Sequence, residues 1–293
     1  MATQGVGRRN QPIAYLFLLP SLVIFGVFVF YPLFFSLWSS FTNWSLISPT
    51  TKYVGLSNYG TLIQDKRFWN ALWNTGYYTL GVVPVGTILA LLLAVALNQK
   101  VMGVKVFRTI LFLPVITSSA IIAIVWTFLF DPDIGLLAYY LSRIGFTSSA
   151  WLRDPHYAMP AIILVSLWKN LGFNMVIFLA GLQSIPMSLY EAASIDGANR
   201  IQQFFRITLP QLMPTTTFVV VMSVISSFQV FDQVYVMTRG GPLFSTETLV
   251  QYIYHHGFET FRMSYASTVA IVLLVLVLLL TLLQLRVLDR DIN

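Results

Sequence analysis

The chain has 293 residues, of which 57% are hydrophobic and 10% are charged, and its mean hydropathy is +0.75. A soluble domain carries about a quarter charged residues, so this composition excludes a chain that hides its apolar surface from water by itself. The net charge of +6 comes from scattered basic residues, which argues against nucleic-acid binding, and the lack of cysteine excludes disulfides, thiol nucleophiles and cysteine metal sites. A polytopic helical membrane protein is expected.

Six apolar runs are each long enough to cross a hydrocarbon core about 30 Å thick. They cover residues 13–37, 71–97, 109–130, 157–182, 212–237 and 266–285. The first run follows Arg8 and Arg9, as in a signal peptide, but its length and its missing cleavage site favour a retained helix. We therefore predict an all-α fold with six transmembrane helices in a single domain, 1–293.

Basic residues near the ends of these runs predict the orientation in the membrane, because Lys and Arg next to short loops stay in the cytoplasm. With the N-terminus inside, the inner segments carry an excess of basic residues and the outer segments are nearly balanced. Both termini are thus expected in the cytoplasm. Prolines inside the runs predict ordinary helix kinks. They are Pro20, Pro32, Pro84, Pro114 and Pro160.

The inner segment between the fourth and fifth runs, 184–211, has the pattern of two short helices. Ser188 and Glu191 have the spacing of a capping box, and Gly197 stands where a left-handed C-terminal cap is expected. Asn199 with Gln202 offers a second helix start. A partly apolar helix pair at the cytoplasmic surface follows.

Such a surface indicates either a protein partner or an amphipathic helix lying on the membrane. The segment carries only Arg200 and Arg206 as basic residues, against Glu191 and Asp196. Two cations balanced by two anions make a poor lipid anchor, so a protein partner is favoured.

The residue types and their spacing in this segment resemble the EAA loop of permease subunits in bacterial binding-protein-dependent, ATP-driven (ABC) importers. Glu191, Ala192 and Ala193 are followed after three residues by Gly197, after nine more by Ile207, and then by Leu209 and Pro210. The surrounding stretch resembles the carbohydrate-uptake branch, with its maltose-type and glycerol-phosphate-type permeases. So do Leu19-Pro20, Tyr31-Pro32 and the segments 54–59 and 238–242.

The resemblance implies a coupling helix that docks on a cytoplasmic ATPase through Glu191, Ala192, Ala193 and Gly197. It also implies a second homologous permease, two ATP-binding subunits, an extracytoplasmic solute-binding protein and a place in the bacterial inner membrane. No phosphate-binding G-x-x-x-x-G-K-[ST] motif occurs in the sequence. We therefore expect this chain to bind no cofactor, with ATP and Mg held by the partner ATPases.

Ionisable residues within a span are costly and are functional candidates, and Lys169 and Asp232 qualify. Polar residues at helical spacing accompany both, and they predict a solute site near the midplane between the fourth and fifth spans. The candidates are Lys169, Asn170, Phe173, Asn174, Ser223, Ser227, Gln229 and Asp232, with Ser226, Phe228 and Phe231 nearby. Alternatively, Lys169 and Asp232 pair with each other or with the sister permease, or Asp232 lies close enough to the outer surface to be hydrated.

Three histidines, His156, His255 and His256, fall in outer segments without companions at ligand spacing, so no metal site is expected. The sequence shows no Ser/His/Asp set and no paired carboxylates within the spans, so a membrane enzyme is not expected. A self-sufficient secondary transporter or channel remains the main alternative, although it would not need an ATPase-docking loop. The sequence does not decide whether the solute is an oligosaccharide, a polyol or glycerol phosphate, and a neutral sugar is favoured.

Overall fold

The computed structural model describes residues 11–48, 50–99, 102–143 and 150–288. Within these ranges the regular elements are helices, and the β-pairing is an isolated bridge between Thr42 and Tyr53. The all-α prediction is confirmed. The sequence predicts a single domain, whereas contacts along the chain divide it into two compact units. The first unit holds residues 1–62 and 255–272, and the second holds 63–254 and 273–293.

Four helices of the described chain are long and apolar enough to cross a membrane, and two bent helix pairs bring the number to as many as six. The four helices are Phe17–Ser39, Lys66–Leu97, Ala158–Ser184 and Met263–Val287. The bent pairs are Val104–Ile116 with Ser119–Leu129, at 99°, and Arg200–Gln211 with Met213–Phe228, at 63°. These elements correspond in order to the six apolar runs.

The first unit combines a long N-terminal helix with part of the C-terminal helix. It contains α1 (Gln11–Phe25), the π-helix η2 (Gly26–Phe30), α2 (Tyr31–Ser39), most of α3 (Ser57–Gln64), the π-helix η4 (His255–Glu259) and the start of α15 (Met263–Leu288). Buried hydroxyl groups join its segments, because Thr42 Oγ1 lies 2.9 Å from Ser264 Oγ and the Ser264 N–H donates to the Trp44 carbonyl.

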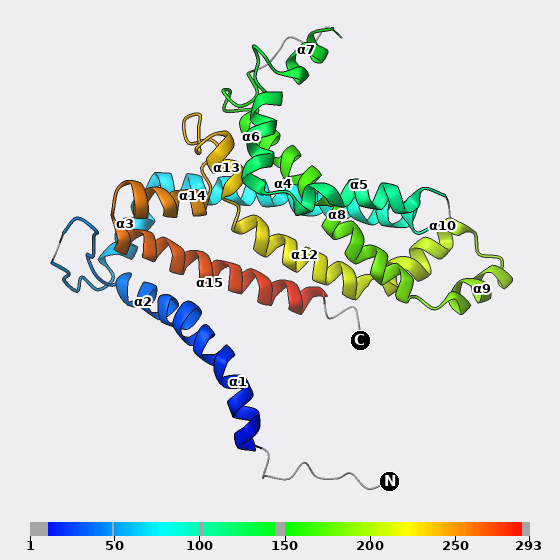
Figure 1. The fold of residues 1–293 in the computed structure, drawn as a ribbon, viewed down its shortest axis with the longest axis horizontal. Helices are drawn as coiled ribbons and strands as arrows, with labels where there is room; N and C mark the ends of the chain where they lie inside the picture. Colours follow the sequence, from blue (N-terminus) through cyan, green and yellow to red (C-terminus); the bar gives the residue numbers. More distant parts are fainter. Residues whose placement is uncertain (1–10, 49, 100–101, 144–149, 289–293) are drawn as a thin grey trace. The chain divides into compact units, whose positions relative to one another are not determined.

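The second unit is a helical bundle centred on α4 (Lys66–Leu97) and α8 (Ala158–Ser184), which pack side by side (Figure 1). Small residues allow the close approach, as Ala90 and Ala94 of α4 lie in one core cluster with Met175 and Phe178 of α8. α5 (Val104–Ile116) lies against α8 at Gly172, where an added Cβ would overlap the Leu111 carbonyl.

The third apolar run, 109–130, is not one straight crossing. α5 ends at Ile116, Thr117 is extended, Ser118 is non-helical, and α6 (Ser119–Leu129) starts a new axis at 99° (Figure 1). Pro114 lies in the last turn of α5 and cannot donate a backbone hydrogen bond there, which weakens the helix just before the break. α7 (Leu136–Arg143) follows α6.

The fifth run, 212–237, is also interrupted. α12 (Met213–Phe228) ends at Phe228, and α13 (Asp232–Met237) begins after three residues whose last, Phe231, has φ −139°. α14 (Leu249–Tyr254) follows and packs against α4. Non-helical backbone inside an apolar segment is tolerated where it lines a cavity or is covered by protein, which makes this break a candidate for function.

Two Pro-containing dipeptides follow π-helices. η2 precedes Tyr31-Pro32, and η3 (Phe204–Thr208) precedes Leu209-Pro210. A proline ring clashes with the carbonyl four residues earlier, and a wider turn just before it relieves that clash. Helical backbone therefore continues through Pro32 and Pro210.

Candidate functional site

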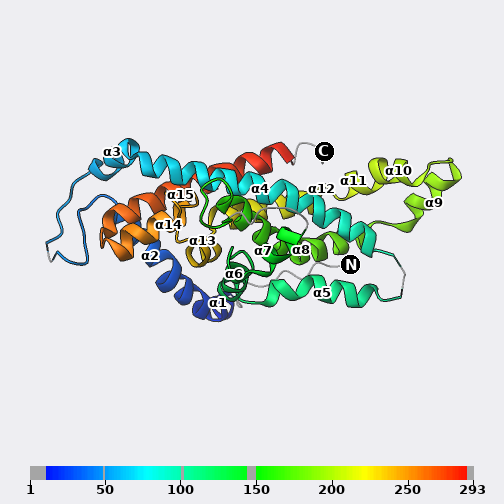
Figure 2. The same ribbon diagram turned by 90° about the horizontal axis from the view of Figure 1, so that it is seen from above.

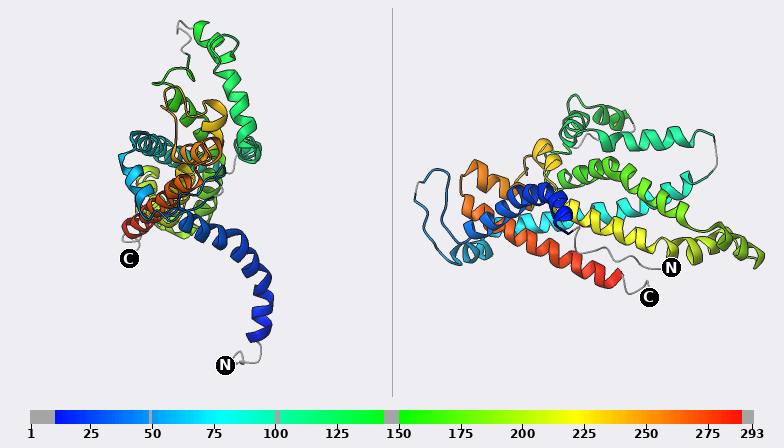
Figure 3. Two further views of the ribbon diagram at one scale, coloured as in Figure 1. Left: turned by 90° about the vertical axis from the view of Figure 1, so that its left-hand side faces the viewer. Right: turned by 60° about the horizontal axis from the view of Figure 1, so that its bottom comes forward.

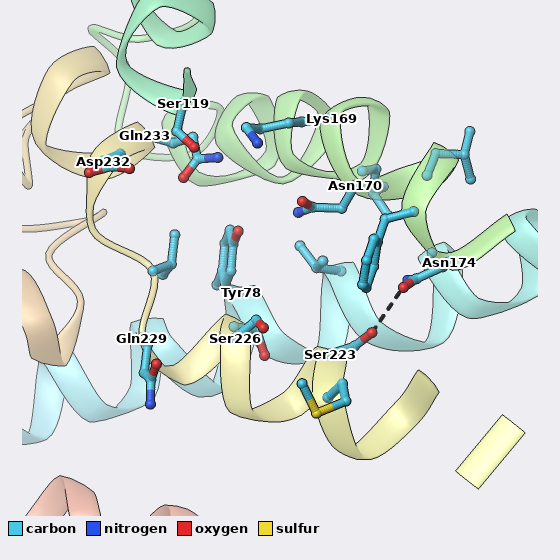
Figure 4. Close-up of a pocket in the computed structure, with 18 of the residues that line it drawn as sticks. Tyr78, Ser119, Lys169, Asn170, Asn174, Ser223, Ser226, Gln229, Asp232 and Gln233 are labelled. Atoms are coloured by element: carbon cyan, nitrogen blue, oxygen red, sulfur yellow. Dashed lines mark hydrogen bonds between the residues drawn. The ribbon is translucent and has the colours of Figure 1, made fainter. Parts of the chain in front are cut away.

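A polar cavity of about 410 Å³ lies inside the second unit, and α4, α6, α8, α12 and α13 contribute to its wall. All eight residues that the sequence predicts for a solute pathway line it (Figure 4). They come from three elements and the break between them: Lys169, Asn170, Phe173 and Asn174 from α8, Ser223 and Ser227 from α12, Gln229 from the break, and Asp232 from α13. The cavity size is typical of small-molecule sites.

Lys169 and Asp232 are the charged residues of the lining, and they differ in exposure. Lys169 is 9% exposed, whereas Asp232 is exposed in the first turn of α13, where a negative charge is favourable. Among the described residues no ion pair within 4.0 Å joins Lys169 to Asp232, so the two charges are not in direct contact. Figure 4 shows the Lys169 amine directed toward Ser119 and Gln233.

Hydrogen bonding links the two walls of the cavity. The Asn174 amide on α8 donates to Ser223 Oγ on α12 at 3.3 Å (Figure 4). Phe173 is 46% exposed, and its ring adds an apolar face among amides and hydroxyls. A cavity that offers donors, acceptors and an aromatic face suits a hydroxyl-rich solute.

Three further polar residues of the lining were not predicted. They are Tyr78 of α4, Ser119 at the start of α6 and Gln233 of α13. Gln233 directly follows the predicted Asp232, and Tyr78 lies in an apolar run, so a search for every polar residue within a span would have found both. Ser119 reaches the cavity because the chain turns between α5 and α6, and nothing in the sequence marked that turn.

The segment 184–211 folds as short helices, as predicted. They are α9 (Met187–Ile195), α10 (Arg200–Gln203), η3 and α11 (Leu209–Gln211). Gly197 adopts φ +78°, and the Ala198 N–H donates to the Ala193 carbonyl at 2.9 Å, which completes a left-handed C-terminal cap. Asn199 and Gln202 form a reciprocal capping box. These two predictions are confirmed.

The predicted capping box of Ser188 and Glu191 is wrong. α9 begins at Met187 with Pro186 as its N-cap, and that cap makes no side-chain hydrogen bond. Ser188 therefore lies within the first turn, two residues after the N-cap position. Proline is suited to a helix start because it presets φ, which explains why the helix begins earlier than the serine suggests.

This segment, which we call the coupling loop (residues 184–211), projects beyond the ends of α8 and α12 (Figures 2 and 3). Its own bonds hold it together, since Tyr190 Oη lies 2.9 Å from Thr208 Oγ1 and the Gln203 amide donates to Ser194 Oγ. Glu191, Ala192, Gly197 and Pro210 are exposed, while Ala193, Ile207 and Leu209 are half-buried. Apolar side chains also face outward, with Ile195 88% and Phe205 60% exposed.

A buried ion pair at the other end of the second unit escaped sequence analysis. Arg67 Nε and Nη2 each donate to one Glu247 carboxylate oxygen at 2.7 Å, and Glu247 is 2% exposed. The Phe244 ring covers the guanidinium at 4.0 Å. The partners lie 180 residues apart, so no local pattern could reveal them.

The histidines form local contacts. His255 Nδ1 lies 2.6 Å from Glu259 Oε2, and His156 Nδ1 lies 3.1 Å from Asp154 Oδ1. The His156 backbone N–H and the side-chain contact hold the pKa of Asp154 below its ordinary value. In the part of the chain that the structure describes, no three His, Asp or Glu residues come together as a metal site would require.

Known proteins match almost the entire chain. Residues 83–293 match the family described as "Binding-protein-dependent transport system inner membrane component". The chain is 39% identical to the probable ABC transporter permease protein YurN of Bacillus subtilis, over 95% of this chain and 96% of that protein. It is 34% identical to the sn-glycerol-3-phosphate transport system permease protein UgpA of Yersinia pestis, over 95% of each.

A solved structure shares the fold. A chain of a bacterial ABC transporter that imports the acidic polysaccharide alginate superposes with a TM-score of 0.86 at 28% identity, covering 97% of this chain and 96% of that one. The family match and the relatives above 30% identity agree with the family that the motif in the coupling loop indicates. The chain therefore belongs to the family of binding-protein-dependent transport system inner membrane components, as a permease subunit of an ABC importer.

Proposed function

We propose that this permease passes a neutral sugar or related polyol through the cavity between α4, α8 and α12, driven by ATP hydrolysis on partner subunits. The cavity itself carries the proposal, since amides, hydroxyls and an aromatic ring converge there from apolar helices. Polar groups within a membrane span are costly, and they therefore usually line a solute pathway or pair with other polar groups. Sugar hydroxyls both donate and accept hydrogen bonds and so match this lining.

The charge of the lining supports a neutral solute. Lys169 and Asp232 are its charged residues, and their formal charges cancel. A phosphorylated solute such as glycerol 3-phosphate, the solute named for one relative, would be better served by an excess of cations. The acidic polysaccharide named for the structural relative would need the same excess.

Coupling to ATP hydrolysis is assigned to the coupling loop. Glu191, Ala192, Ala193 and Gly197 would contact an ATPase subunit, with Ile207, Leu209 and Pro210 setting the path into α12. Two alanines and a glycine permit close approach, and Glu191 offers a charge for a basic partner. The sequence has no phosphate-binding loop, so this chain would be non-catalytic, with ATP and Mg on its partners.

The proposed complex contains a second homologous permease, two ATP-binding subunits and an extracytoplasmic solute-binding protein. Both termini and the coupling loop would lie in the cytoplasm, as the distribution of basic residues favours. α6, α7 and the loop after α13 would then face the extracytoplasmic side.

Uptake by proteoliposomes tests the proposal. The purified complex and its binding protein would be supplied with a panel of maltose, maltotriose, trehalose and glycerol 3-phosphate, and wild type compared with Glu191→Ala and Gly197→Asp. We expect sugar uptake that requires ATP and is lost in both variants, with glycerol 3-phosphate excluded. Uptake by this chain alone, without ATPase or binding protein and unchanged in the variants, would indicate a secondary transporter instead.

A further inference from the structure

A second cavity, of about 500 Å³, lies in the same unit and belongs to none of the roles assigned above. Three segments converge on it: the end of α6 with the residues after it, the segment before α8, and the end of α13 with the loop that follows. Its lining residues are Thr127, Phe130, Asp131, Pro132, Leu152, Arg153, Val236, Met237, Thr238, Arg239 and Pro242. We call it the α6–α13 cavity.

Charged side chains of both signs line this cavity. Arg153 Nη2 lies 3.4 Å from Asp131 Oδ2, so this ion pair is long. Asp131 Oδ1 accepts the backbone N–H groups of Asp133 and Ile134, and these bonds, then the charge of Arg153, hold the pKa of Asp131 below its ordinary value. The carboxylate is therefore ionised at neutral pH.

Arg239 adds a second guanidinium. It directly follows Thr238 at the end of α13, is exposed, and holds a left-handed backbone with φ 52°, which is uncommon for residues other than glycine. The ion pairs of the described residues include none with Arg239. Among these side chains, Asp131 supplies only acceptors and the two arginines supply only donors.

The short helix α13 connects the two cavities. Its first residues, Asp232 and Gln233, line the polar cavity, while Val236 and Met237 line the α6–α13 cavity. From Asp232 to Thr238 the helical rise is about 9 Å. The cavities therefore lie at successive levels along one helix, and α6 borders both, through Ser119 and Thr127.

We propose that the α6–α13 cavity is an outer sugar-binding subsite, which holds a ring through Asp131, Arg153 and Arg239 before the solute enters the polar cavity. This inference rests on the proposed function and adds a second binding site for the solute. Neighbouring ring hydroxyls each donate and accept, so a carboxylate beside guanidinium groups satisfies both roles at once. A solute of two or more rings would occupy both cavities together, and its transport would depend on the subsite more strongly than that of a single ring.

Protection from a thiol reagent tests occupancy directly, because the chain has no cysteine of its own. Thr127→Cys places a thiol in the cavity wall, and Leu243→Cys places one on a side chain that is 86% exposed and outside the lining. Modification by a membrane-impermeant maleimide would be followed with the assembled complex in proteoliposomes, without ATP, with and without millimolar maltotriose. Val236→Cys would replace Thr127→Cys if that variant failed to assemble.

We expect maltotriose to slow modification of Thr127→Cys several-fold and to leave Leu243→Cys unchanged. Equal slowing of both would indicate that the binding protein or the sister permease covers this face, and no slowing would mean that the cavity takes no sugar. Either result overturns the subsite. Failure of the proposed function would be distinct, since it would appear as wild-type vesicles without ATP-dependent sugar uptake.

A matched pair of carboxylate variants gives a second test. Asp131 lines the cavity, whereas Asp133, which also lies near Arg153 at 3.8 Å, is exposed and does not. Asp131→Asn keeps the backbone acceptor but loses the charge, and we expect about a tenfold higher KM for maltotriose uptake at unchanged kcat, with a smaller rise for glucose. Asp133→Asn should match wild type. Equal KM values for both variants would contradict the proposal.

Discussion

The two loops that follow α8 and α13 are built in opposite ways. The segment 238–248 after α13 is bound to the rest of its unit, because Arg67 pairs with Glu247, and the Asn74 amide donates to the carbonyls of Phe244 and Glu247 at 2.9 and 3.0 Å. Its Thr238 and Thr246 hydroxyls lie 2.7 Å apart. The side-chain hydrogen bonds of residues 190–208 in the coupling loop, by contrast, join that loop to itself.

The backbones of the two loops differ in the same sense. Arg239, Leu243 and Phe244 hold positive φ values of 52°, 53° and 60°, a strained backbone that surrounding contacts must maintain. In the coupling loop the positive φ falls on Gly197, which adopts it without strain, and Ile195 is 88% exposed. The loop after α13 thus depends on contacts with the rest of its unit, whereas the coupling loop holds its turn through Gly197. Both loops expose an apolar side chain, since Leu243 is 86% exposed.

The largest effect is expected where the first loop is anchored. Glu247→Ala removes a buried carboxylate and both of its hydrogen bonds from Arg67, so we predict a loss of about 3 kcal/mol in the free energy of unfolding. Thermal unfolding of the purified complex in detergent measures it. Asp133→Asn is the control, because its pair with Arg153 is exposed and should contribute nothing measurable. Equal unfolding temperatures for the two variants would show that Glu247 anchors nothing.

The second prediction concerns the coupling loop. Ile195→Asp and Phe205→Asp replace exposed side chains, so the unfolding temperature should hardly change, because surface substitutions usually stay within about 0.5 kcal/mol. If an ATPase covers these side chains, sugar-stimulated ATP hydrolysis should fall about tenfold, which corresponds to about 1.4 kcal/mol of lost docking energy. Ile47→Asp, which is 74% exposed in the first unit, is the control. Normal stimulation in both coupling-loop variants would refute docking through this surface.

Local chemistry explains what the sequence could predict. The sequence predicts the Gly197 cap and the Asn199–Gln202 box because capping depends on residues a few positions apart. It predicts the polar stripe of Lys169, Asn170 and Asn174 because a single helix presents all three. These features need no knowledge of how helices pack.

The missed features depend on distant residues or on a change of axis. The 99° turn between α5 and α6 falls in an apolar run where Pro114 predicts only a kink. The Arg67–Glu247 pair joins residues 180 positions apart. The α6–α13 cavity requires three separate segments to converge, so its charged residues looked like ordinary loop charges.

The smallest predicted effect compares the glycines of the two loops. Gly197 and Gly240 both hold left-handed backbone, with φ +78° and +83°, so alanine at either should cost about 1 kcal/mol from backbone strain. An added Cβ at Gly197 meets nothing within 4 Å, whereas at Gly240 it would lie 3.3 Å from Glu247 Cβ. Gly240→Ala should therefore lower the unfolding temperature more than Gly197→Ala, because the anchored loop cannot yield. If Gly197→Ala were the more damaging in the isolated permease, the coupling loop would be the more tightly packed of the two, and the contrast between them would be reversed.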